Sequence, residues 1–496
     1  VIESFNREAG LIFLLAGSLF LIVDVFRGKK IRFDAIETTW LILLVIFAFS
    51  ILYSLSFIRS FTETLRYLAY FFIFISFRNS DDKKRLISDF LVPFVIVNSF
   101  ILSVVALLTF IPLIKIPMPL NTLNLYYPSF GHNRLSDMLI FAVPMTVGLY
   151  AFASHKNFKI IYFLLLIFFT VILFLTFSRG AVLALILSSC LVLLKIGNKL
   201  VNAGKLSGKI NIIFKSAVIF GVIAIFYLVV NFINSNFLMN PPQYKGFSKP
   251  AMFELRLEYW RQAVESIKKY PFFGTGLDTF RYVSKKTQLR PSAWSFYTHN
   301  QYLEIFSETG FMGGLIFSLL IILLVLNAYA NLHIDIDSDK KILNLSIFIA
   351  LTASALHSII DYDWQFLSVF MLFFICCNLL ISKPLNPLLN LTKRYKTLLI
   401  MIFLAMGIVR IGLLSDSDRM IAKAENLSDN GNYDLALTVL NKAYLFDPNN
   451  NEIHKEYVWI YEQKNDPEKR HYWIQKAIEA DSQDSDSLKI KDLIIH

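Results

Sequence analysis

Arg179 is the first candidate for chemistry in this sequence, because its guanidinium stands between two runs of apolar residues. The segment reads TFSRGAV, so Ser178 and Gly180 are its direct neighbours. An ionisable side chain at membrane depth costs on the order of several kcal/mol when it has no partner, which makes such residues functional candidates. A guanidinium at this position is suited to gripping phosphate oxygens in bidentate fashion. The alternative is that Arg179 simply snorkels to the membrane surface.

His299 is the second candidate, in the segment YTHNQYLEIFSETGFMGGLIF, where a polar loop passes into an apolar helix. A free imidazole has a pKa near ~6.5 and is suited to proton transfer. The alternative is a structural hydrogen-bonding histidine. Glu304 and Glu308 lie four apart on one helical face and could orient a cation, although solvent exposure is the expectation for both. Gly310 and Gly313–Gly314 permit a turn or close helix packing.

The polar loop from about residue 234 to 298 is strongly cationic. Its four acidic residues are outnumbered by ten basic ones, which are Lys245, Lys249, Arg256, Arg261, Lys268, Lys269, Arg281, Lys285, Lys286 and Arg290. Such a surface beside a bilayer suits an anionic substrate or a lipid phosphate. Helical spacing in FELRLEYWRQAVESIKKY also fits a solvated amphipathic helix, which is the alternative for most of the lysines.

The elements that position these residues are apolar helices. Of the 496 residues, 55% are hydrophobic and 17% are charged, against roughly 25% charged in an ordinary soluble domain. Runs of about 20 apolar residues match the thickness of a bilayer. The sequence therefore predicts an all-α, polytopic membrane protein with about 12 transmembrane helices, at residues 9–26, 38–58, 62–77, 86–112, 135–153, 160–177, 180–196, 215–233, 302–330, 342–360, 365–382 and 397–414.

The charges of the short connections predict the sidedness of these helices. Alternate connections carry 21 Lys and Arg on one side and five on the other. The positive-inside rule makes the first side cytoplasmic. The cationic loop, the Ser178–Gly180 turn and the C-terminal tail then face outward. The N-terminus would also face outward; because the chain starts at Val1 without a signal-peptide pattern, we expect an initial helix to precede it.

Several classes of chemistry have no support in the sequence. Cys190, Cys376 and Cys377 all lie in apolar segments, so no disulfide framework is expected. The sequence has no zinc-like Cys/His spacing, Walker loop or dinucleotide fingerprint. We therefore expect no metal and no cofactor, and any driving energy must come with the substrate.

Three segments resemble the hallmarks of the O-antigen ligase and polymerase superfamily of bacterial membrane glycosyltransferases. They are FSRG at 177–180, RLEYWRQAVESIKKYPFFGTGLDTF at 256–280 and HNQYLEIFSETGFMGG at 299–314. Their order and spacing also match the family, and the resemblance extends over residues 150–320. Outside that range only the topology is similar.

The resemblance implies an activity and roles for particular residues. A preassembled glycan would be moved from undecaprenyl diphosphate to an acceptor hydroxyl on the outer face of the bacterial plasma membrane, without metal or nucleotide. Arg179 and Arg256 would bind the diphosphate. His299 would be the catalytic base, or would hold the acceptor or the phosphate. Preorganised guanidinium groups would stabilise the charge that develops on the departing diphosphate.

Supporting roles are expected for Arg261, Glu308 and Asp361. In HSIIDYDWQF at 357–366, Asp361 or Asp363 could orient an arginine, although interface capping around Trp364 is the favoured interpretation. In SFGHNRLSDMLIFAVP at 129–144, Asn133 occupies the family's usual asparagine position. Arg134 and Asp137 in the same segment could form an ion pair at the helix end.

The tail after residue 414 is charged and rich in amides, and it resembles tetratricopeptide repeats. Ala443 and Ala477 are 34 residues apart, as are Pro448 and Ser482, and 34 is the period of that repeat. Two copies are fewer than the roughly three that an independent solenoid needs. The tail would then bind a partner protein or act as a stabilising cap.

These expectations define two domains. Residues 1–414 form a transmembrane O-antigen ligase-like domain with its outward loop at about 234–301, and residues 415–496 form extracytoplasmic helical repeats. The partners are an undecaprenyl-diphosphate-linked glycan, a glycan or lipid acceptor and the bilayer, with no nucleic acid. A polymerase of lipid-linked repeat units is the alternative function. A transporter is favoured least, because transport sites place charges near the bilayer midplane.

Overall fold

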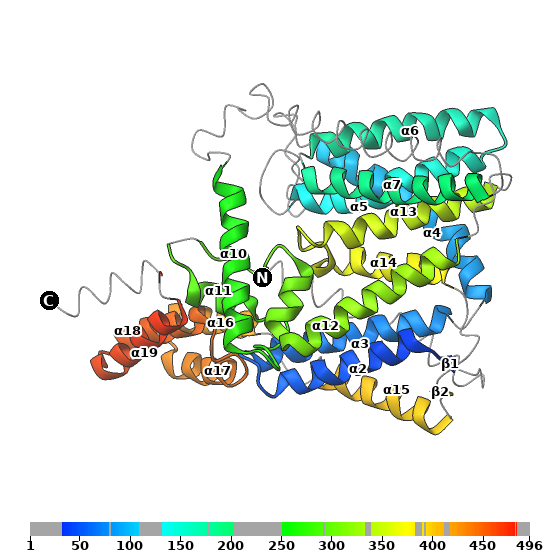
Figure 1. Ribbon diagram of the computed structural model, residues 1–496. Helices are drawn as coiled ribbons and strands as arrows, with labels where there is room; N and C mark the ends of the chain where they lie inside the picture. Colours follow the sequence, from blue (N-terminus) through cyan, green and yellow to red (C-terminus); the bar gives the residue numbers. More distant parts are fainter. Residues whose placement is uncertain are drawn as a thin grey trace. The chain divides into compact units, whose positions relative to one another are not determined.

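Helices dominate the computed structural model of this chain (Figure 1). The described residues are 32–78, 81–108, 131–176, 178–202, 250–290, 293–332, 339–381, 389–390, 393–410, 417–481 and 483. Of the expected spans, those at 9–26 and 215–233 lie outside these residues, and the others coincide with helices. Within the described part, the all-α expectation has one exception, a two-residue antiparallel pair between β1 (Arg32–Phe33) and β2 (Leu389–Asn390).

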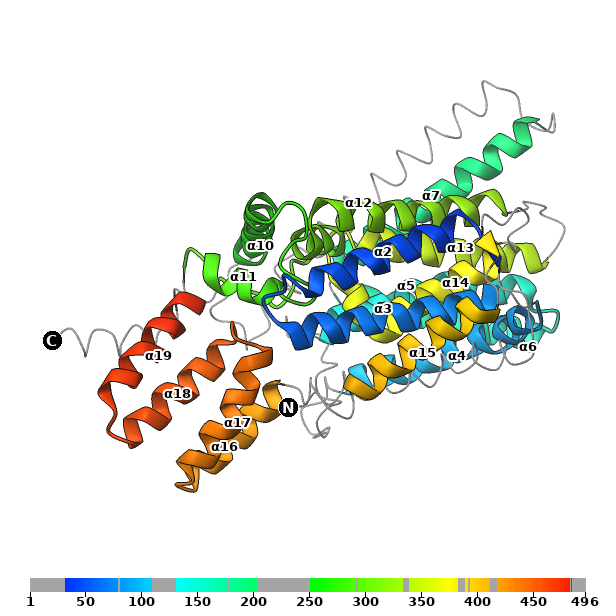
Figure 2. The ribbon, with the colours of Figure 1, turned by 90° about the horizontal axis from the view of Figure 1, so that it is seen from below.

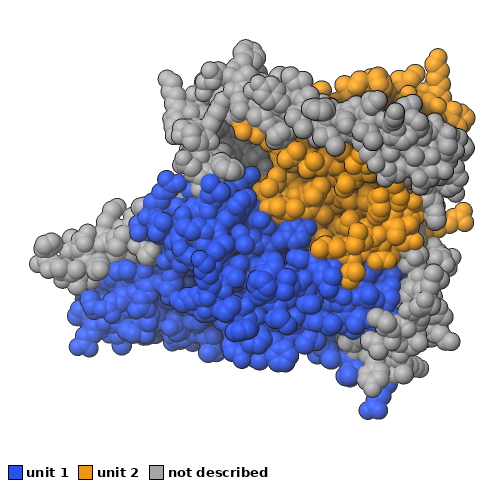
Figure 3. Space-filling model, in the orientation of Figure 1, with its two compact units in different colours: residues 1–79, 248–320, 384–496 blue, residues 80–247, 321–383 orange. Residues whose placement is uncertain are grey.

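The chain divides into two compact units. Unit 1 comprises Val1–Asn79, Ser248–Leu320 and Pro384–His496, and unit 2 comprises Ser80–Phe247 and Ile321–Lys383. Unit 1 therefore joins an N-terminal helix pair, most of the described outward loop and the tail. Figure 2 gives a second view of the helices, and Figure 3 colours unit 1 blue and unit 2 orange.

Aromatic packing holds together the apolar helices of unit 1. Helix α2 (Ala35–Ile51) packs on α3 (Phe57–Arg78) through Trp40 against Phe71 and Phe47 against Tyr67, with ring centroids 5.6 and 4.9 Å apart. The other face of α3 meets α15 (Lys393–Ile408), where Phe72 contacts Phe403 at 4.7 Å. These large rings bury much apolar surface and add specific edge-to-face contacts.

Helix α2 ends earlier than the expected span at 38–58. Its last residue is Ile51, and the turn that follows is held by Ser54, whose hydroxyl donates to the Ser56 carbonyl at 2.8 Å. The backbone N–H of Leu55 donates to the carbonyl of Thr275 in the outward loop at 2.8 Å. The backbone N–H groups of Leu52, Tyr53 and Ser54 donate to carbonyls three residues earlier, so the helix ends in a tight turn before Leu55 reaches the loop.

Four helices form the tail, and they repeat with the period that the sequence predicts. They are α16 (Ser417–Asp429), α17 (Tyr433–Phe446), α18 (Asn451–Gln463) and α19 (Pro467–Ala480). A shift of 34 residues maps both bounds of α16 onto α18, and both bounds of α17 onto α19. Successive helices pack side by side (Figure 2). Ala443 and Ala477, the equivalent small residues, are both buried.

The tail docks on the short loop helix α11 (Phe280–Thr287) through equivalent positions of its two repeats. Asp447 accepts a hydrogen bond from the Tyr282 hydroxyl at 2.6 Å. Asp481, 34 residues later, accepts one from the Gln288 amide at 2.6 Å. Asn449 also donates to the Leu55 carbonyl at 2.8 Å. Within unit 1, the tail and the outward loop therefore form one packed assembly.

Arg59, at the start of α3, is the centre of that assembly. Its buried guanidinium donates to the Tyr282 hydroxyl at 2.7 Å and lies 3.4 Å from Asp278 of the loop. It also lies 3.2 Å from Asp418 and 3.7 Å from Asp447 of the tail. The opposite end of α3 carries a separate buried cluster, in which Arg78 pairs with Asp34 at 2.5 Å and Glu37 at 2.6 Å.

Unit 2 is a bundle of apolar helices. It contains α4 (Asp81–Leu108), α5 (Gly131–Phe152), α6 (Lys156–Leu175), α7 (Arg179–Asn202), α13 (Asp339–His357), the 3-10 turn η2 (Asp363–Gln365) and α14 (Leu367–Leu380). Helix α13 packs against both α5 and α7, and α5 also contacts α6. The loop helix α10 (Pro250–Lys269) belongs to unit 1, and so does α12 (Gln301–Ala330) as far as Leu320.

Length and composition mark some of these helices as membrane spans. Among the described residues, Asp89–Leu108, Arg134–Phe152, Lys156–Leu175 and Gln301–Ala330 are long and apolar enough to cross a bilayer. Helix α6 buries only Phe169, Ile172 and Leu173, and it exposes large apolar side chains such as Phe163 at 51% and Leu164 at 59%. A continuous apolar surface of this kind is stable only against lipid or another protein. The chain is therefore a membrane protein.

Candidate active site

The backbone of His299 is strained. Its φ is 54°, a left-handed conformation that is uncommon for residues other than glycine. The flanking residues enforce this turn: the Thr298 hydroxyl donates to the Asn300 carbonyl at 2.6 Å, and the Asn300 side chain accepts from Leu303 N at 2.9 Å. Asn300 thereby caps the start of α12. The half-buried imidazole stacks on Tyr259 of α10, with centroids 5.7 Å apart and an interplanar angle of 20°.

Arg256 lies one helical turn before Tyr259 on α10 and is half-buried. Burial raises the pKa of Tyr259, and the positive charges of Arg290 and Arg256 oppose that rise. Both guanidinium groups therefore act electrostatically on the ring that supports His299. Unit 1 thus brings together Arg256 and His299, and it adds Tyr259 and Arg290, which the sequence analysis did not single out. Only the cationic excess of the loop hinted at Arg290.

The expectation that Glu304 and Glu308 face solvent is wrong, since both side chains are buried in α12. Glu308 accepts the backbone N–H groups of Asp278, Thr279 and Phe280 at 2.9, 2.8 and 2.9 Å. Glu304 accepts the backbone N–H of Thr298 at 2.9 Å. Both carboxylates therefore hold loop backbone that enters or leaves the site. Glu308 is thus a clamp on the loop.

Glycines allow the loop to approach α12 closely. Gly310 breaks the helix with a φ of 70°, and a Cβ there would lie 2.3 Å from the carbonyl oxygen of Phe272. Gly274 has a φ of 67°, and a Cβ there would lie 2.2 Å from the backbone of Glu308. Because the helix is broken at Gly310, the backbone N–H of Phe311 donates to the carbonyl of Pro271 in the loop at 2.7 Å. Of the glycines predicted to permit a turn or close helix packing, Gly310 is thus the one that makes the turn.

Arg261, an expected supporting residue, ties α10 to α11. Its guanidinium donates to Glu258 at 2.8 Å and to the Thr287 carbonyl at 2.7 Å, and it also pairs with Glu265. The charge of Arg261 lowers the pKa of Glu258. Its contacts are therefore those of a structural clamp on the loop.

Arg179 occupies unit 2, at the first position of α7, and its side chain is exposed. Ser178 before it is buried, and its hydroxyl lies 3.5 Å from Nε2 of His357. Gly180 after it packs closely on α13: an added Cβ would lie 2.4 Å from Cδ1 of Ile360 and 3.0 Å from Nε2 of His357. Serine and glycine are therefore required on either side of Arg179 by their contacts with His357 and Ile360.

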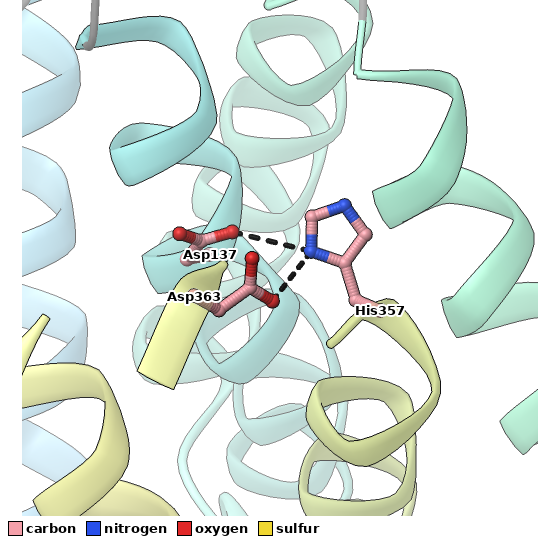
Figure 4. A group of neighbouring side chains, drawn as sticks. All are labelled: Asp137, His357 and Asp363. Atoms are coloured by element: carbon pink, nitrogen blue, oxygen red, sulfur yellow. Dashed lines mark hydrogen bonds and ion pairs between the residues drawn. The ribbon is translucent and has the colours of Figure 1, made fainter. Parts of the chain in front are cut away.

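His357 is clasped by two buried carboxylates. Its Nδ1 lies 2.6 Å from Asp363 of η2 and 3.3 Å from Asp137 of α5. Figure 4 shows both carboxylates facing this nitrogen, while Nε2 points away from them. These three side chains could also hold a metal ion. Ligands around a metal with bonds of about 2.1 Å stand roughly 3 Å or more apart, so the 2.6 Å contact is a hydrogen bond and the cluster is closed without a metal.

The surroundings of this cluster correct three expectations. Asp137 contacts His357 instead of Arg134, whose guanidinium lies 4.4 Å from the centre of the Phe366 ring. Asp363 binds a histidine, whereas the alternative considered for Asp361 or Asp363 was to orient an arginine. Trp364 is fully buried and donates to the Ser354 hydroxyl at 3.0 Å, so it is a core residue and no interface cap.

Asp361 is also buried, and its carboxylate accepts the backbone N–H of Tyr362 at 2.9 Å. It belongs to unit 2, as Arg179 does, whereas Arg256 and His299 belong to unit 1. In the sequence, His357 was recognised only as part of a motif. The HSIIDYD segment, which places one histidine and two carboxylates within seven residues, is the feature that could have indicated this cluster. Asn133 lies in the first turn of α5.

Comparison with known proteins agrees with the motifs. The family model described as O-antigen ligase matches residues 163–318, a range that includes Arg179, Arg256 and His299. A relative, the ComP-specific O-oligosaccharyltransferase of Acinetobacter baylyi (strain ATCC 33305 / BD413 / ADP1), is 26% identical over 292 residues. The alignment covers 56% of this chain and 47% of the relative, so the chain spans about half the length of that protein. The resemblance is thereby confirmed, and residues 163–318 carry the signature of the O-antigen ligase family.

Proposed function

We propose that this protein is a membrane glycosyltransferase that moves a preassembled glycan from undecaprenyl diphosphate to an acceptor hydroxyl on the outer face of the bacterial plasma membrane. Residues 1–414 form the transferase, and residues 415–496 are an extracytoplasmic tail of tetratricopeptide-like repeats. The family match over residues 163–318 supports the reaction class.

The observation that carries the proposal is the turn at His299. The His299 turn has a strained backbone, and its half-buried imidazole stacks on Tyr259, a ring on which the charges of Arg256 and Arg290 act. Strain of this kind costs about 1–3 kcal/mol and persists at sites where geometry matters for function. The imidazole is a group that can take the proton of an acceptor hydroxyl, and the guanidinium groups are suited to an anionic substrate.

The chemistry follows from these groups. The oxygen of the acceptor hydroxyl attacks the anomeric carbon of the glycan, and its proton passes to a ring nitrogen of His299. The bond between the anomeric carbon and the diphosphate oxygen breaks, and its electron pair leaves with the diphosphate. Arg256 and Arg179 stabilise the charge that develops there. Such preorganised electrostatic stabilisation is worth about 3–4 kcal/mol for a single group in other enzymes.

Contacts at the two ends of α3 support the proposed sidedness. The Arg59 end contacts the loop and the tail, whereas the Arg78 end belongs to the more cationic connections. The helix has 22 residues, which at 1.5 Å per residue is about 33 Å, the thickness of a bilayer core. The loop and tail would therefore share the less cationic, outer side.

The test is a reaction of purified protein with undecaprenyl-diphosphate-linked oligosaccharide in EDTA, read by mass spectrometry. Separate arms contain lipid A–core, ComP, after which the relative is named, or no acceptor. Product that requires an acceptor establishes a ligase, and lengthened lipid-linked glycan without one establishes the polymerase alternative. No product with any acceptor, with or without divalent cations, would contradict the proposal.

Variants then test the assigned roles. His299→Gln should reduce kcat by at least about 100-fold, as expected for loss of a general base. His471→Gln is the matched control, because His471 is exposed on α19. Arg256→Lys keeps the charge but loses the bidentate grip, so it should raise the donor KM. Normal kinetics of both His299→Gln and Arg256→Lys would refute the assignment.

A further inference from the structure

The turn that carries Arg179 rests on a buried charged cluster that the family match does not cover. Asp137, His357 and Asp363 lie outside residues 163–318. They come from α5, the end of α13 and η2, so three elements of unit 2 meet at one imidazole. Its Nε2 faces Ser178, the residue immediately before Arg179.

Two buried carboxylates beside Nδ1 favour the positively charged imidazolium, because an opposite charge within a few ångströms stabilises the ionised form. Asp363 fixes the ring orientation through a hydrogen bond of 2.6 Å, and Asp137 adds a second ion pair at 3.3 Å. With Nδ1 held in this way, the Nε2–H of His357 can only point toward the Ser178 hydroxyl. The cluster therefore sets both the charge and the direction of the imidazole.

Close packing transmits this geometry to the turn. Gly180 has no room for a side chain against His357 and Ile360. Ser178 is buried on the same ring, and its carbonyl accepts the first helical hydrogen bond of α7 from Val182 N at 3.3 Å. Arg179 lies between these two anchored residues and is exposed. Its backbone is thus positioned on both sides.

We infer that His357, clasped by Asp137 and Asp363, is a positioning residue that holds the Ser178–Gly180 turn so that Arg179 can bind the diphosphate of the lipid-linked donor. The inference rests on the proposed function, which assigns Arg179 to that diphosphate. A buried ionic cluster adds little to stability compared with apolar packing, whereas it can specify one geometry. The position of Arg179 matters because a shift of about 1 Å at a binding group can cost roughly 100-fold in rate.

Gly180→Ala tests the inference without removing any charge. The added methyl group overlaps Cδ1 of Ile360 and lies against the His357 ring, so either the Ile360 side chain or the turn must shift. We expect the donor KM to rise at least about tenfold, while the acceptor KM stays unchanged. Gly180→Ala combined with Ile360→Val removes the nearest overlapping atom, so it should recover part of the loss. Gly148→Ala is the control, because a Cβ there would lie 2.9 Å from Leu343 and Ser346, a crowded position between α5 and α13 that is away from the turn.

Charge variants provide the second arm. Asp363→Asn should raise the donor KM more than Asp137→Asn, in line with the contacts of 2.6 and 3.3 Å. Binding of undecaprenyl diphosphate to each variant, measured by tryptophan fluorescence, separates donor binding from catalysis. Thermal unfolding of each variant separates positioning from loss of fold, and folded variants with weakened donor binding support the inference.

Three outcomes would distinguish the possible failures. If Arg179→Ala leaves donor binding unchanged, the assigned role of Arg179 is wrong and the proposed function needs another phosphate group. If Arg179→Ala weakens binding but Gly180→Ala and Asp363→Asn do not, the positioning role of His357 is wrong. A divalent cation bound stoichiometrically to the purified protein and lost in Asp363→Asn would also overturn the inference, because the cluster would then be a metal site.

Discussion

Substitution of Arg59 by methionine should release the tail from the outward loop. Methionine keeps much of the apolar stem and removes the guanidinium that contacts Asp278, Asp418 and Asp447. Asp278 keeps its ion pair with Arg281 at 3.5 Å, whereas the buried Asp447 would lose the charge of Arg59 where water cannot replace it. The side chain of Asp418 is 41% exposed and would lose little.

The magnitude follows from these burials. Breaking a buried ion pair by removing one partner costs about 3–5 kcal/mol. Asp447 keeps hydrogen bonds from Tyr282 at 2.6 Å and Ser417 at 2.7 Å, which places the expected cost near the lower end, about 3 kcal/mol. A loss of that size raises the population of undocked tail by roughly 100-fold.

Hydrogen exchange in detergent micelles measures this change. Amides of α16 and α11 should exchange roughly 100-fold faster in Arg59→Met, since local opening controls their protection. Arg470→Met is the control: Arg470 pairs with Glu462 at 3.4 Å on an exposed surface of the tail and should contribute less than about 1 kcal/mol. Unchanged protection of α16 and α11 in Arg59→Met would refute the view that this cluster docks the tail.

Three further perturbations have definite expected outcomes. Glu308→Gln puts a donor in place of one of the two oxygens that accept three backbone N–H groups. It should lower the free energy of unfolding by about 2–4 kcal/mol and lower kcat. Thermal unfolding and the transfer assay measure these effects, and unchanged values would contradict the clamp. Gly310→Ala forces a left-handed φ on alanine and overlaps Phe272, so it should destabilise the protein by more than about 1 kcal/mol; an unchanged melting temperature would disprove that strain. Burial lowers the pKa of His454 from 6.5 to about 4, so the folded tail binds fewer protons than the unfolded tail between these values. Its stability should be constant above pH 6.5 and fall by about 3 kcal/mol as the pH drops toward 4. Fluorescence of Trp473, which packs against Tyr457, reports that loss of stability. In the His454→Gln variant the stability of the tail should not fall over this pH range.

Local patterns in the sequence were sufficient for the helices and the repeat. A run of apolar residues favours a helix wherever it packs, so hydropathy alone located the helices α3 and α6. The 34-residue spacing of Ala443 and Ala477 is likewise local, and the bounds of the tail helices reproduce it. The motif around His299 needed no fold either, because its residue types and order already matched the family.

Only the tertiary structure decided the partners of the charged residues. Glu304 and Glu308 have the spacing of a solvated helical face, yet loop backbone groups far along the chain cover them. Arg59 and Asp418 are 359 positions apart, and no periodicity relates them.

Long-range packing also explains why Arg134 does not form the ion pair with Asp137 that their spacing suggested. A charge pairs with whatever opposite charge the packed helices bring within about 4 Å, and for Asp137 that group is His357. Sequence by itself therefore determined the membrane class, the helices and the resemblance to the O-antigen ligase family, through patterns that act over a few residues. The folded chain determined which carboxylates hold Arg59 and His357, because long-range packing selects those contacts and local spacing does not.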